Sequence, residues 1–317
     1  MTVMAVYTHI SAEELTQYLT RFDIGTLASF AGITDGVENT NYRLVTTAGS
    51  FILTLFEKRV RAEDLPFCLS FMEHLQGRGI PCPRVIPDKD GERIVPFKGK
   101  PAVIITFLEG RWPQRTENFH AAAVGRTLAQ MHLAGKDFDM RRDNPMSLPV
   151  WNALIDSCGS KADKLERGLF PFLKKELHWQ MENRPEFLPT GPIHADLFPD
   201  NVFFDGEKLT GVIDFYFSCT DVFAYDLMLT LNAWCFDSTG QVSAQKSSEL
   251  IGAYKKERPL SAQEQASLAF FGRAAALRII ATRLYDWFHR VPDAVVAPKD
   301  PAEYVRILKF HQKEAAA

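Results

Sequence analysis

The 317-residue sequence lacks paired cysteines, a long apolar run and an excess of charge of one sign. Its five cysteines are odd in number and form no Cys-x-x-Cys pair, which argues against a disulfide framework and a zinc site. No window approaches the roughly 18 uncharged apolar residues of a membrane span, and the start, MTVMAVYTHIS, lacks the basic and apolar regions of a signal peptide. We therefore expect a cytoplasmic protein with no membrane association.

The formal net charge of −3 is too small to indicate an electrostatic partner. A basic surface would be needed to bind nucleic acid or anionic lipid, and none is evident. The composition, with 46% hydrophobic residues, provides enough apolar side chains for two buried cores in a chain of this length. We expect two domains, a small-molecule substrate, no nucleic-acid partner and no obligate protein partner.

The first 107 residues predict a small sheet of roughly five strands that carries helices. Ser11-Ala-Glu-Glu14 has the spacing of a capping box and begins an amphipathic helix. A second helix is expected over residues 62–76, before the break at Pro81-Cys-Pro83. Segments rich in β-branched and aromatic residues, separated by turn signals, predict antiparallel strands at 26–33, 41–46, 51–56, 84–86, 93–97 and 102–107.

From residue 108 the pattern becomes mostly helical. Helices are expected over residues 118–133, in a stretch from 151 to 180, and over 221–237 and 262–289. The exception is one hairpin, in which Val202-Phe-Phe204 and residues 209–213 flank a turn at Asp205-Gly-Glu-Lys208. The prediction is an α+β protein with an N-terminal lobe, residues 1–107, built on an antiparallel sheet, and a helical C-terminal lobe, residues 108–317.

This hairpin is expected to gather the residues that carry chemistry. It brings Asn201, before its first strand, and Asp214, after its second, to the same side, and Asp196 lies in the loop just before it. Hard divalent cations such as Mg²⁺ prefer oxygen ligands, often completed by phosphate and water. In phosphoryl transfer one Asp accepts the proton of the attacking hydroxyl, while a second Asp and an Asn hold the metal. Asp196, Asp214 and Asn201 match these roles.

The motifs also carry a family resemblance. His194-Ala-Asp-Leu-Phe-Pro-Asp-Asn201 has the spacing of the protein-kinase catalytic loop, with Ile213-Asp-Phe215 in the place of the metal-binding triplet. Together with Tyr225-Asp-Leu227 they resemble the aminoglycoside phosphotransferase and choline kinase superfamily, whose fold is bilobal and protein-kinase-like. Gly36-Val-Glu-Asn-Thr-Asn-Tyr42 and Leu53-Thr-Leu-Phe-Glu57 look like its type II homoserine kinase branch. The resemblance runs from about Val6 to about Phe288.

The resemblance implies a role for each matching residue. Asp196 would be the catalytic base, Asn201 and Asp214 would bind Mg²⁺, and Asp226 would brace the catalytic loop. ATP would lie between the lobes, where a loop would cover its phosphates and the backbone of a hinge would meet adenine. The residues implied for nucleotide binding are Gly32, Gly36, Asn39, Thr40 and Asn41 in the loop and Thr106, Phe107 and Leu108 in the hinge.

One position departs from the broader family. That family carries a Lys or Arg on the strand that here reads Phe51-Ile-Leu-Thr54, paired with a Glu on the next helix. Thr54 stands at the basic position, and Phe67 or Cys68 stands near the acidic one. The loss of both together is physically reasonable because a lone buried charge is costly. Lys58 and Arg43 are the untested substitutes for the missing cation.

Several residues also have plain structural interpretations. His194 is expected to orient the loop through hydrogen bonds rather than to act as an acid or base, and His132 is expected to be a satisfied buried histidine. Asp226 could be a helix-end acid, and glycines between strands usually serve turns. A homoserine pocket would need a cation for the α-carboxylate and acceptors for the ammonium group. The candidates are Arg278 or Arg283 for the carboxylate, with Tyr216 and Asn232 nearby.

The expected activity is ATP- and Mg²⁺-dependent phosphorylation of L-homoserine to O-phospho-L-homoserine, a step of threonine biosynthesis. A kinase for another small alcohol, such as choline, ethanolamine or an aminoglycoside, is the alternative within enzymes, because a fold does not specify its substrate. The alternative from another class is a pseudokinase that binds nucleotide without turnover. Thr54 favours that alternative, and the complete set of Asp196, Asn201 and Asp214 argues against it.

Overall fold

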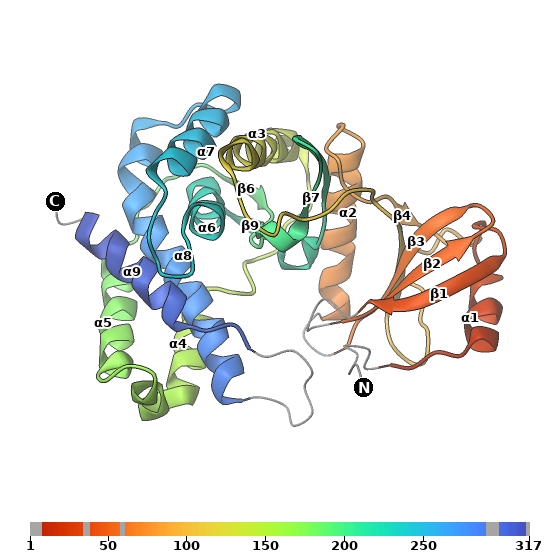
Figure 1. Ribbon diagram of the computed structural model, residues 1–317, viewed down its shortest axis with the longest axis horizontal. Helices are drawn as coiled ribbons and strands as arrows, with labels where there is room; N and C mark the ends of the chain where they lie inside the picture. The colour runs from red at the N-terminus through yellow and green to blue at the C-terminus, as the bar shows by residue number, and fades with distance from the viewer. Residues whose placement is uncertain (1–7, 34–38, 58–60, 290–297, 315–317) are drawn as a thin grey trace. The chain divides into compact units, whose positions relative to one another are not determined.

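The computed structural model describes residues 8–33, 39–57, 61–289 and 298–314 (Figure 1). The chain divides into two compact units, one containing the described residues up to Glu109 and the other those from Gly110 to 289 and from Pro298 to 314. The division falls two residues after the domain boundary expected from the sequence. An antiparallel sheet dominates the first unit and helices dominate the second, which confirms the expected α+β class.

The first unit is built on a five-stranded antiparallel sheet with the order β1-β2-β3-β5-β4 (Figure 1). A two-residue turn, Thr47-Ala48, joins β2 to β3, because Thr46 pairs directly with Gly49. A sheet of roughly five strands was expected from six candidate segments, and five of these segments form strands among the described residues of this unit. Their bounds are β1 Leu27–Ile33, β2 Thr40–Thr46, β3 Gly49–Leu55, β4 Val85–Ile86 and β5 Ala102–Thr106.

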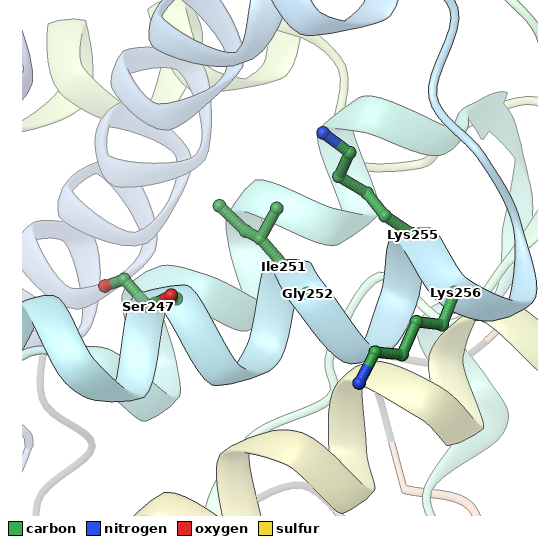
Figure 2. A pocket seen from close by; sticks show the side chains of 6 residues that line it. Ser247, Ile251, Gly252, Lys255 and Lys256 are labelled. Atoms are coloured by element: carbon green, nitrogen blue, oxygen red, sulfur yellow. The ribbon is translucent and has the colours of Figure 1, made fainter.

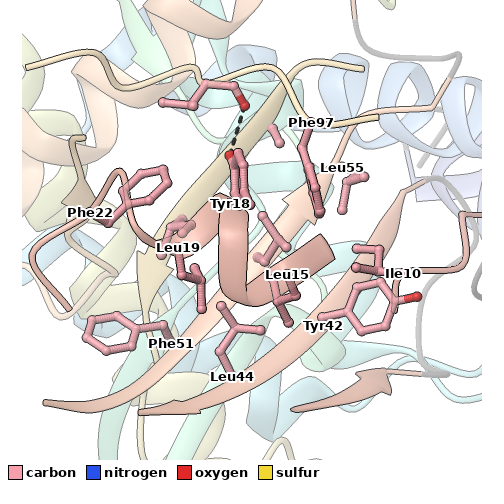
Figure 3. Packing of buried hydrophobic residues seen from close by; sticks show 14 of the residues in the cluster. Ile10, Leu15, Tyr18, Leu19, Phe22, Tyr42, Leu44, Phe51, Leu55 and Phe97 are labelled. Carbon is pink, nitrogen blue, oxygen red and sulfur yellow. Dashed lines mark hydrogen bonds between the residues drawn. The ribbon is translucent and has the colours of Figure 1, made fainter. Parts of the chain in front are cut away.

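One face of this sheet carries the hydrophobic core of the unit. Helix α1, Ala12–Leu19, lies on it, and its predicted capping box between Ser11 and Glu14 is present. Figure 3 shows Leu15 and Tyr18 of the helix among side chains from alternate positions of the strands. The Tyr18 hydroxyl donates to the Val95 carbonyl at 2.9 Å. Because side chains alternate along a strand, the intervening positions face the other side of the sheet.

The predicted strand at residues 93–97 is wrong. This segment makes only one backbone bond to β5, from Val95 N to the Ala102 carbonyl, and one isolated bridge between Phe97 and Lys100. The Val95 carbonyl accepts the Tyr18 hydroxyl, and the chain reverses at Lys98-Gly99 with φ values of 51° and 74°, so no continuous ladder with β5 forms. The predicted helix 62–76 is a short 3₁₀ turn, Ala62–Asp64, followed by α2, Leu65–Gln76.

The second unit is mostly helical. The predicted stretch 151–180 is two helices, because the chain turns between Gly159, at φ 52°, and Gly168, at φ 79°. The described residues contain two helices that the sequence analysis did not identify, α7 and α9. Helix α8 packs against α4, α6 and α9. The helices are α3 Asn118–Ala134, α4 Leu148–Cys158, α5 Leu169–Glu182, α6 Phe223–Cys235, α7 Ala244–Glu257, α8 Ala262–Phe288 and α9 Ala302–Glu314.

Two small antiparallel ladders flank the loop that carries the predicted catalytic residues. The expected hairpin is present as β7, Val202–Asp205, paired with β8, Lys208–Val212. A second ladder, between β6, Thr190–Ile193, and β9, Cys219–Val222, was not predicted. Strand β9 occupies the first residues of the predicted helix 221–237, and α6 begins only at Phe223. None of the helices in the described ranges has the length and apolar character of a bilayer span.

His311 ties three helices of the second unit together. Its ring donates through Nε2 to Asn232 Oδ1 of α6 at 2.7 Å, and the Asn232 amide donates to the Gly272 carbonyl of α8 at 3.0 Å. A Cβ at Gly272 would come within 2.6 Å of the His311 ring, so the contact requires glycine there. Burial, with Arg273 nearby, lowers the pKa of His311 to about 4.

This pKa predicts a loss of stability in mild acid. A histidine whose folded-state pKa is depressed gives stability that is present above its unfolded pKa, near 6.5, and is lost as the pH falls below it. Between pH 7.5 and pH 5.5 the loss from one such group is about 1.4 kcal/mol. Urea unfolding at both pH values should show this difference between wild type and His311→Gln. Equal pH dependence in the two proteins would contradict the assignment.

Candidate active site

The loop between β6 and β7 brings the three predicted catalytic and metal-binding residues to one end of the β7–β8 hairpin. The Asn201 amide donates to the Asp196 carbonyl at 2.8 Å and reaches Asp196 Oδ2 at 3.4 Å. The Ile213 N–H donates to the Asn201 carbonyl at 3.0 Å, so the hairpin ladder extends one step and places Asp214 directly after it. Asp196 and Asn201 are partly buried, and Asp214 is exposed.

Two residues of this region have left-handed backbone conformations without being glycine. Ala195 has φ 61° and Asp214 has φ 65°. Such conformations cost roughly 1–3 kcal/mol for a non-glycine residue and persist only where the surroundings enforce them. Ala195 directly precedes the predicted base, and Asp214 is itself a predicted metal ligand. The backbone at both positions is therefore held in place by the packing around it.

His194 has the orienting role expected from the sequence. The ring is fully buried, accepts the Asp196 N–H at Nδ1 over 3.2 Å and donates from Nε2 to the Ile213 carbonyl at 3.0 Å. Burial lowers its pKa, which favours the neutral ring that this donor and acceptor pattern requires. His194 thus connects the segment before Asp196 to the segment before Asp214.

Asp226, on α6, binds the backbone of the loop that carries Asp196. Its two carboxylate oxygens accept the N–H groups of His194 and Ala195, each at 2.9 Å, and Oδ2 also accepts His132 Nε2 at 3.1 Å. Burial alone would raise the pKa of Asp226, but the hydrogen bonds from His132 and the backbone outweigh it and hold that pKa below its ordinary value. The carboxylate is therefore ionised and serves as the acceptor for the loop.

A chain of buried hydrogen bonds continues beyond Asp226. His132 Nδ1 meets the Tyr254 hydroxyl at 2.7 Å, and Arg258 donates to the same hydroxyl at 3.2 Å. Arg258 also forms an ion pair with Glu264 at 2.8 Å. Burial lowers the pKa of His132, so this ring is neutral and can donate to Asp226 while it accepts from Tyr254. His132 is the satisfied buried histidine that the sequence suggested.

Arg278 reaches the predicted catalytic base. Its Nη1 lies 3.1 Å from Asp196 Oδ1, and only 4% of the Arg278 side chain is exposed. The guanidinium carbon lies 5.1 Å from the centre of the Phe217 ring, three residues after Asp214. Of the four predicted substrate residues, Arg278 is the one for which the structure shows a side-chain contact with the Asp196 carboxylate.

The other three predicted substrate residues have different surroundings. Asn232 is buried and its amide joins Gly272 and His311, so its predicted substrate contact has little support. Arg283 pairs with Glu303 at 2.6 Å and stacks on Tyr304 of α9. Tyr216 follows Asp214 in the chain, and its carbonyl accepts Arg142 at 2.9 Å. The roles of Tyr216 and Arg283 in substrate binding stay predictions.

Of the residues predicted for the loop over the nucleotide phosphates, the described ones lie at the end of β1 and the start of β2. Gly32 pairs with Tyr42, and the Asn41 side chain accepts the Thr54 hydroxyl at 2.8 Å. A neutral polar pair thus occupies the position at which the family pattern places a lysine. Thr40 donates to Glu57 at 2.6 Å, and Asn39 lies just before it in a bend. Gly36 and Lys58 lie outside the described residues.

The predicted hinge follows β5. The N–H groups of Thr106 and Phe107 donate to the carbonyls of Arg84 and Ser50, at 2.9 and 3.1 Å. An adenine ring that binds to this segment would therefore hydrogen-bond to the carbonyls of these two residues or to the backbone of Leu108. Arg43, one of the candidate substitutes for the missing lysine, stacks its guanidinium 4.3 Å from the centre of the Phe107 ring.

A shallow depression on α7 is a second candidate surface (Figure 2). It is lined by residues of this helix alone, and the lining contains hydroxyls, two ammonium groups and an isoleucine but no carboxylate, imidazole or thiol. Such a lining offers neither the carboxylate expected of the base in phosphoryl transfer nor a carboxylate, imidazole or thiolate metal ligand. The residues are Ser247, Ser248, Ile251, Gly252, Lys255 and Lys256.

Sequence reasoning missed the partners that position the loop. Neither the contact of Arg278 with Asp196 nor that of His132 with Asp226 was predicted, although all four residues had been noted. The available signal was composition, because Arg278 stands in the apolar run Leu277-Arg-Ile-Ile280. A charged residue inside a buried helix segment requires a partner. The apolar run around Arg278 therefore predicts that the arginine has a charged partner, but it does not identify that partner.

Comparison with known proteins agrees with this geometry. Residues 29–260 match the phosphotransferase enzyme family, and the chain belongs to this family. Proteins named homoserine kinase align with 98% of the chain and 95–96% of their own length: those of Nitrobacter winogradskyi, Afipia carboxidovorans and Rhodopseudomonas palustris are 52%, 50% and 50% identical. The resemblance stated from the motifs is thus confirmed over nearly the whole chain.

Solved structures share the fold at low identity. An amicoumacin kinase in complex with AMP-PNP, Ca²⁺ and its antibiotic superposes with a TM-score of 0.74 at 14% identity, covering 96% of this chain and 94% of that one. A choline kinase from Cryptosporidium parvum gives 0.66 at 14% identity, covering 91% and 89%. The expected protein-kinase-like phosphotransferase fold is confirmed.

Proposed function

We propose that this protein transfers the γ-phosphoryl group of ATP to the hydroxyl of L-homoserine, forming O-phospho-L-homoserine for threonine biosynthesis. The observation that carries the proposal is the loop in which Asp196, Asn201 and Asp214 converge, with its backbone held by Asp226. The substrate is proposed from the relatives named homoserine kinase, which match 98% of the chain at 50–52% identity.

In the proposed reaction Asp196 orients the substrate hydroxyl and accepts its proton. The hydroxyl oxygen bonds to the γ-phosphorus as the bond between that phosphorus and the bridging oxygen breaks, and ADP leaves. The His194 ring and the Asp226 carboxylate keep the Asp196 backbone in place, so the base does not need to reorganise during the step. Positioning is the main contribution of this chain's own residues.

Asn201 and Asp214 suit a divalent cation. Both offer side-chain oxygens, Asp214 is exposed at the end of the hairpin, and the bond from Ile213 to Asn201 keeps the two residues together. Oxygen donors of this kind favour a hard ion, and we propose Mg²⁺. When bound, Mg²⁺ would neutralise charge on the nucleotide phosphates.

Nucleotide binding in the first unit is proposed without the lysine of the family pattern. The pair of Asn41 and Thr54 faces the side of the sheet opposite the α1 core, as does Arg43, which stands two positions along β2. We propose that this face contacts ATP and that the carbonyls of the hinge meet adenine. A cytoplasmic location is proposed as well, supported by the five buried cysteines, none of which forms a disulfide.

The first experiment is ADP production by the purified protein with ATP and Mg²⁺ and one acceptor at a time: L-homoserine, L-serine, choline, ethanolamine or kanamycin. We expect turnover with L-homoserine far above the others. Turnover with another acceptor alone would keep the phosphotransferase reaction and overturn the substrate. No turnover with any acceptor, together with thermal stabilisation by ATP, would replace the proposal with a nucleotide-binding pseudokinase.

Asp196→Asn should lower kcat by at least about 10²- to 10⁴-fold, because general-base assistance and positioning are both lost. Thermal stability should fall moderately, because the buried Arg278 guanidinium loses its charged partner although Asn keeps the size of the side chain, and kcat is therefore measured on the folded protein. Asp200→Asn is the matched control, as Asp200 lies in the same loop but is exposed. Retention of full kcat by Asp196→Asn would remove Asp196 from the mechanism.

Asp214→Ala should raise the Mg²⁺ concentration needed for half-maximal turnover by about 10- to 100-fold or more, because a direct ligand is lost. The fold should persist, since Asp214 is exposed. The control is Asp205→Ala, an exposed acid at the other end of the same hairpin. The measurement is a Mg²⁺ titration of initial rate, and an unchanged midpoint in Asp214→Ala would count against the metal role.

A further inference from the structure

Arg278 is a charged residue in a place where helix stability does not call for one. It lies in α8 within a run of buried residues that extends from Phe270 to Ala281. Transferring a guanidinium out of water costs several kcal/mol unless a partner compensates, and an apolar residue at such a site is often at least as stable. The presence of arginine therefore points to a role beyond packing α8 against its neighbours.

Three buried arginine–carboxylate pairs lie in the described part of the second unit, and they differ in the exposure of the carboxylate. Arg273 pairs with Glu176 at 2.6 Å and Arg258 with Glu264 at 2.8 Å, and the acids are only 1% and 2% exposed. Arg278 is itself the most buried of the three arginines, yet its partner Asp196 is 18% exposed. The carboxylates of the first two pairs are closed to solvent, whereas the carboxylate of the third can be reached by a ligand.

The contact distinguishes the two oxygens of Asp196. Oδ1 accepts Arg278 Nη1 at 3.1 Å, whereas the contact of Oδ2 with Asn201 is 3.4 Å and correspondingly weak. The torsion that rotates a carboxylate is broad and roughly two-fold, so it does not fix the group by itself. A charge-assisted bond to one oxygen fixes it. The catalytic loop His194–Asn201 contains no lysine or arginine that could do this.

Recognition of the substrate's α-carboxylate, the role that the sequence analysis gave Arg278, fits the structure less well. A ligand contact needs an accessible guanidinium, and that of Arg278 is 4% exposed and engaged with Asp196. Releasing it to bind a substrate would leave the base without its charge-assisted partner. The burial and the pairing both favour an action on the base.

We propose that Arg278 is the positioning residue of the catalytic base: it holds Asp196 Oδ1 so that Oδ2 receives the proton of the substrate hydroxyl. This inference rests on the proposed phosphotransferase function, and it changes the role of Arg278 from substrate recognition to base orientation. The expected consequence is that Arg278 acts on kcat through Asp196 and has little effect on the binding of either substrate.

A double-mutant cycle tests this directly. Arg278→Met should lower kcat by about 10- to 100-fold, the effect of a misplaced catalytic group, with KM for ATP and for homoserine changed less than about threefold. In the Asp196→Asn background the same substitution should change the residual kcat less than about twofold, because there is no base left to position. Independent effects that multiply in the double variant would overturn the proposal.

A second comparison separates base orientation from carboxylate recognition. With L-homoserine amide, which lacks the α-carboxylate charge, Arg278→Met should show the same loss of kcat as with L-homoserine. A loss confined to L-homoserine and expressed in KM would assign Arg278 to the substrate carboxylate instead. Arg273→Met is the matched control, since it removes another buried arginine of α8, and it should alter unfolding but not the kcat of the folded protein.

The outcomes also separate this proposal from the proposed function. If the wild type does not phosphorylate homoserine but does phosphorylate another acceptor of the panel, the function changes and the same cycle is run with that acceptor. If the wild type is active on homoserine and Arg278→Met keeps full kcat, the function stands and the positioning role falls. Should Arg278→Met not fold, Arg278→Lys, which retains the charge, is expected to show an intermediate kcat with unchanged KM.

Discussion

The buried carboxylate of Asp226 is the constraint on which the rest of the site depends. Its two oxygens take up the N–H groups of consecutive residues, His194 and Ala195, and this requires a backbone conformation that alanine disfavours. The resulting bend sets where Asp196 emerges. Because the carboxylate is ionised and has no access to water, removing any of its donors leaves a buried charge less well satisfied. The geometry of the candidate site and the local stability are thus coupled in one group.

The second unit places its buried charges in pairs, and the pairs serve two purposes. Arg258 with Glu264 and Arg273 with Glu176 join helices in an interior where each charge alone would be costly. Arg278 also forms a buried ion pair, but its partner, the carboxylate of Asp196, is accessible to solvent. The electrostatic cost of burying an arginine is offset in each case by its partner, and only the accessibility of that partner separates a structural pair from one that can act on a substrate.

The first unit lacks the buried lysine–glutamate pair of the family pattern. Its sheet has one face closed by α1 and another on which Asn41 and Thr54 form a neutral pair. A lysine on β3 would need an acid on α2 to compensate it in a buried position, and Phe67 and Cys68 offer none. The loss of both members together keeps the sheet free of an unpaired charge. Under the proposed function, neutralisation of the nucleotide would depend on the proposed metal site and on groups such as Arg43.

Much of this protein follows from its sequence alone. The strands of the sheet, the α1 cap, the catalytic hairpin and the positions of Asp196, Asn201 and Asp214 could be predicted, because they depend on local periodicity, turn chemistry and short spacing. The strand at residues 93–97 failed because its single backbone bond to β5 is followed by a tight reversal at Lys98-Gly99, and β6 and β9 were missed because they pair across 26 or more residues. Only the tertiary structure decided that Arg278 meets Asp196, 82 positions away, and that His132 meets Asp226, 94 away. A sequence shows that a buried charge needs a partner, but the partner is selected by the packing of helices far apart in the chain.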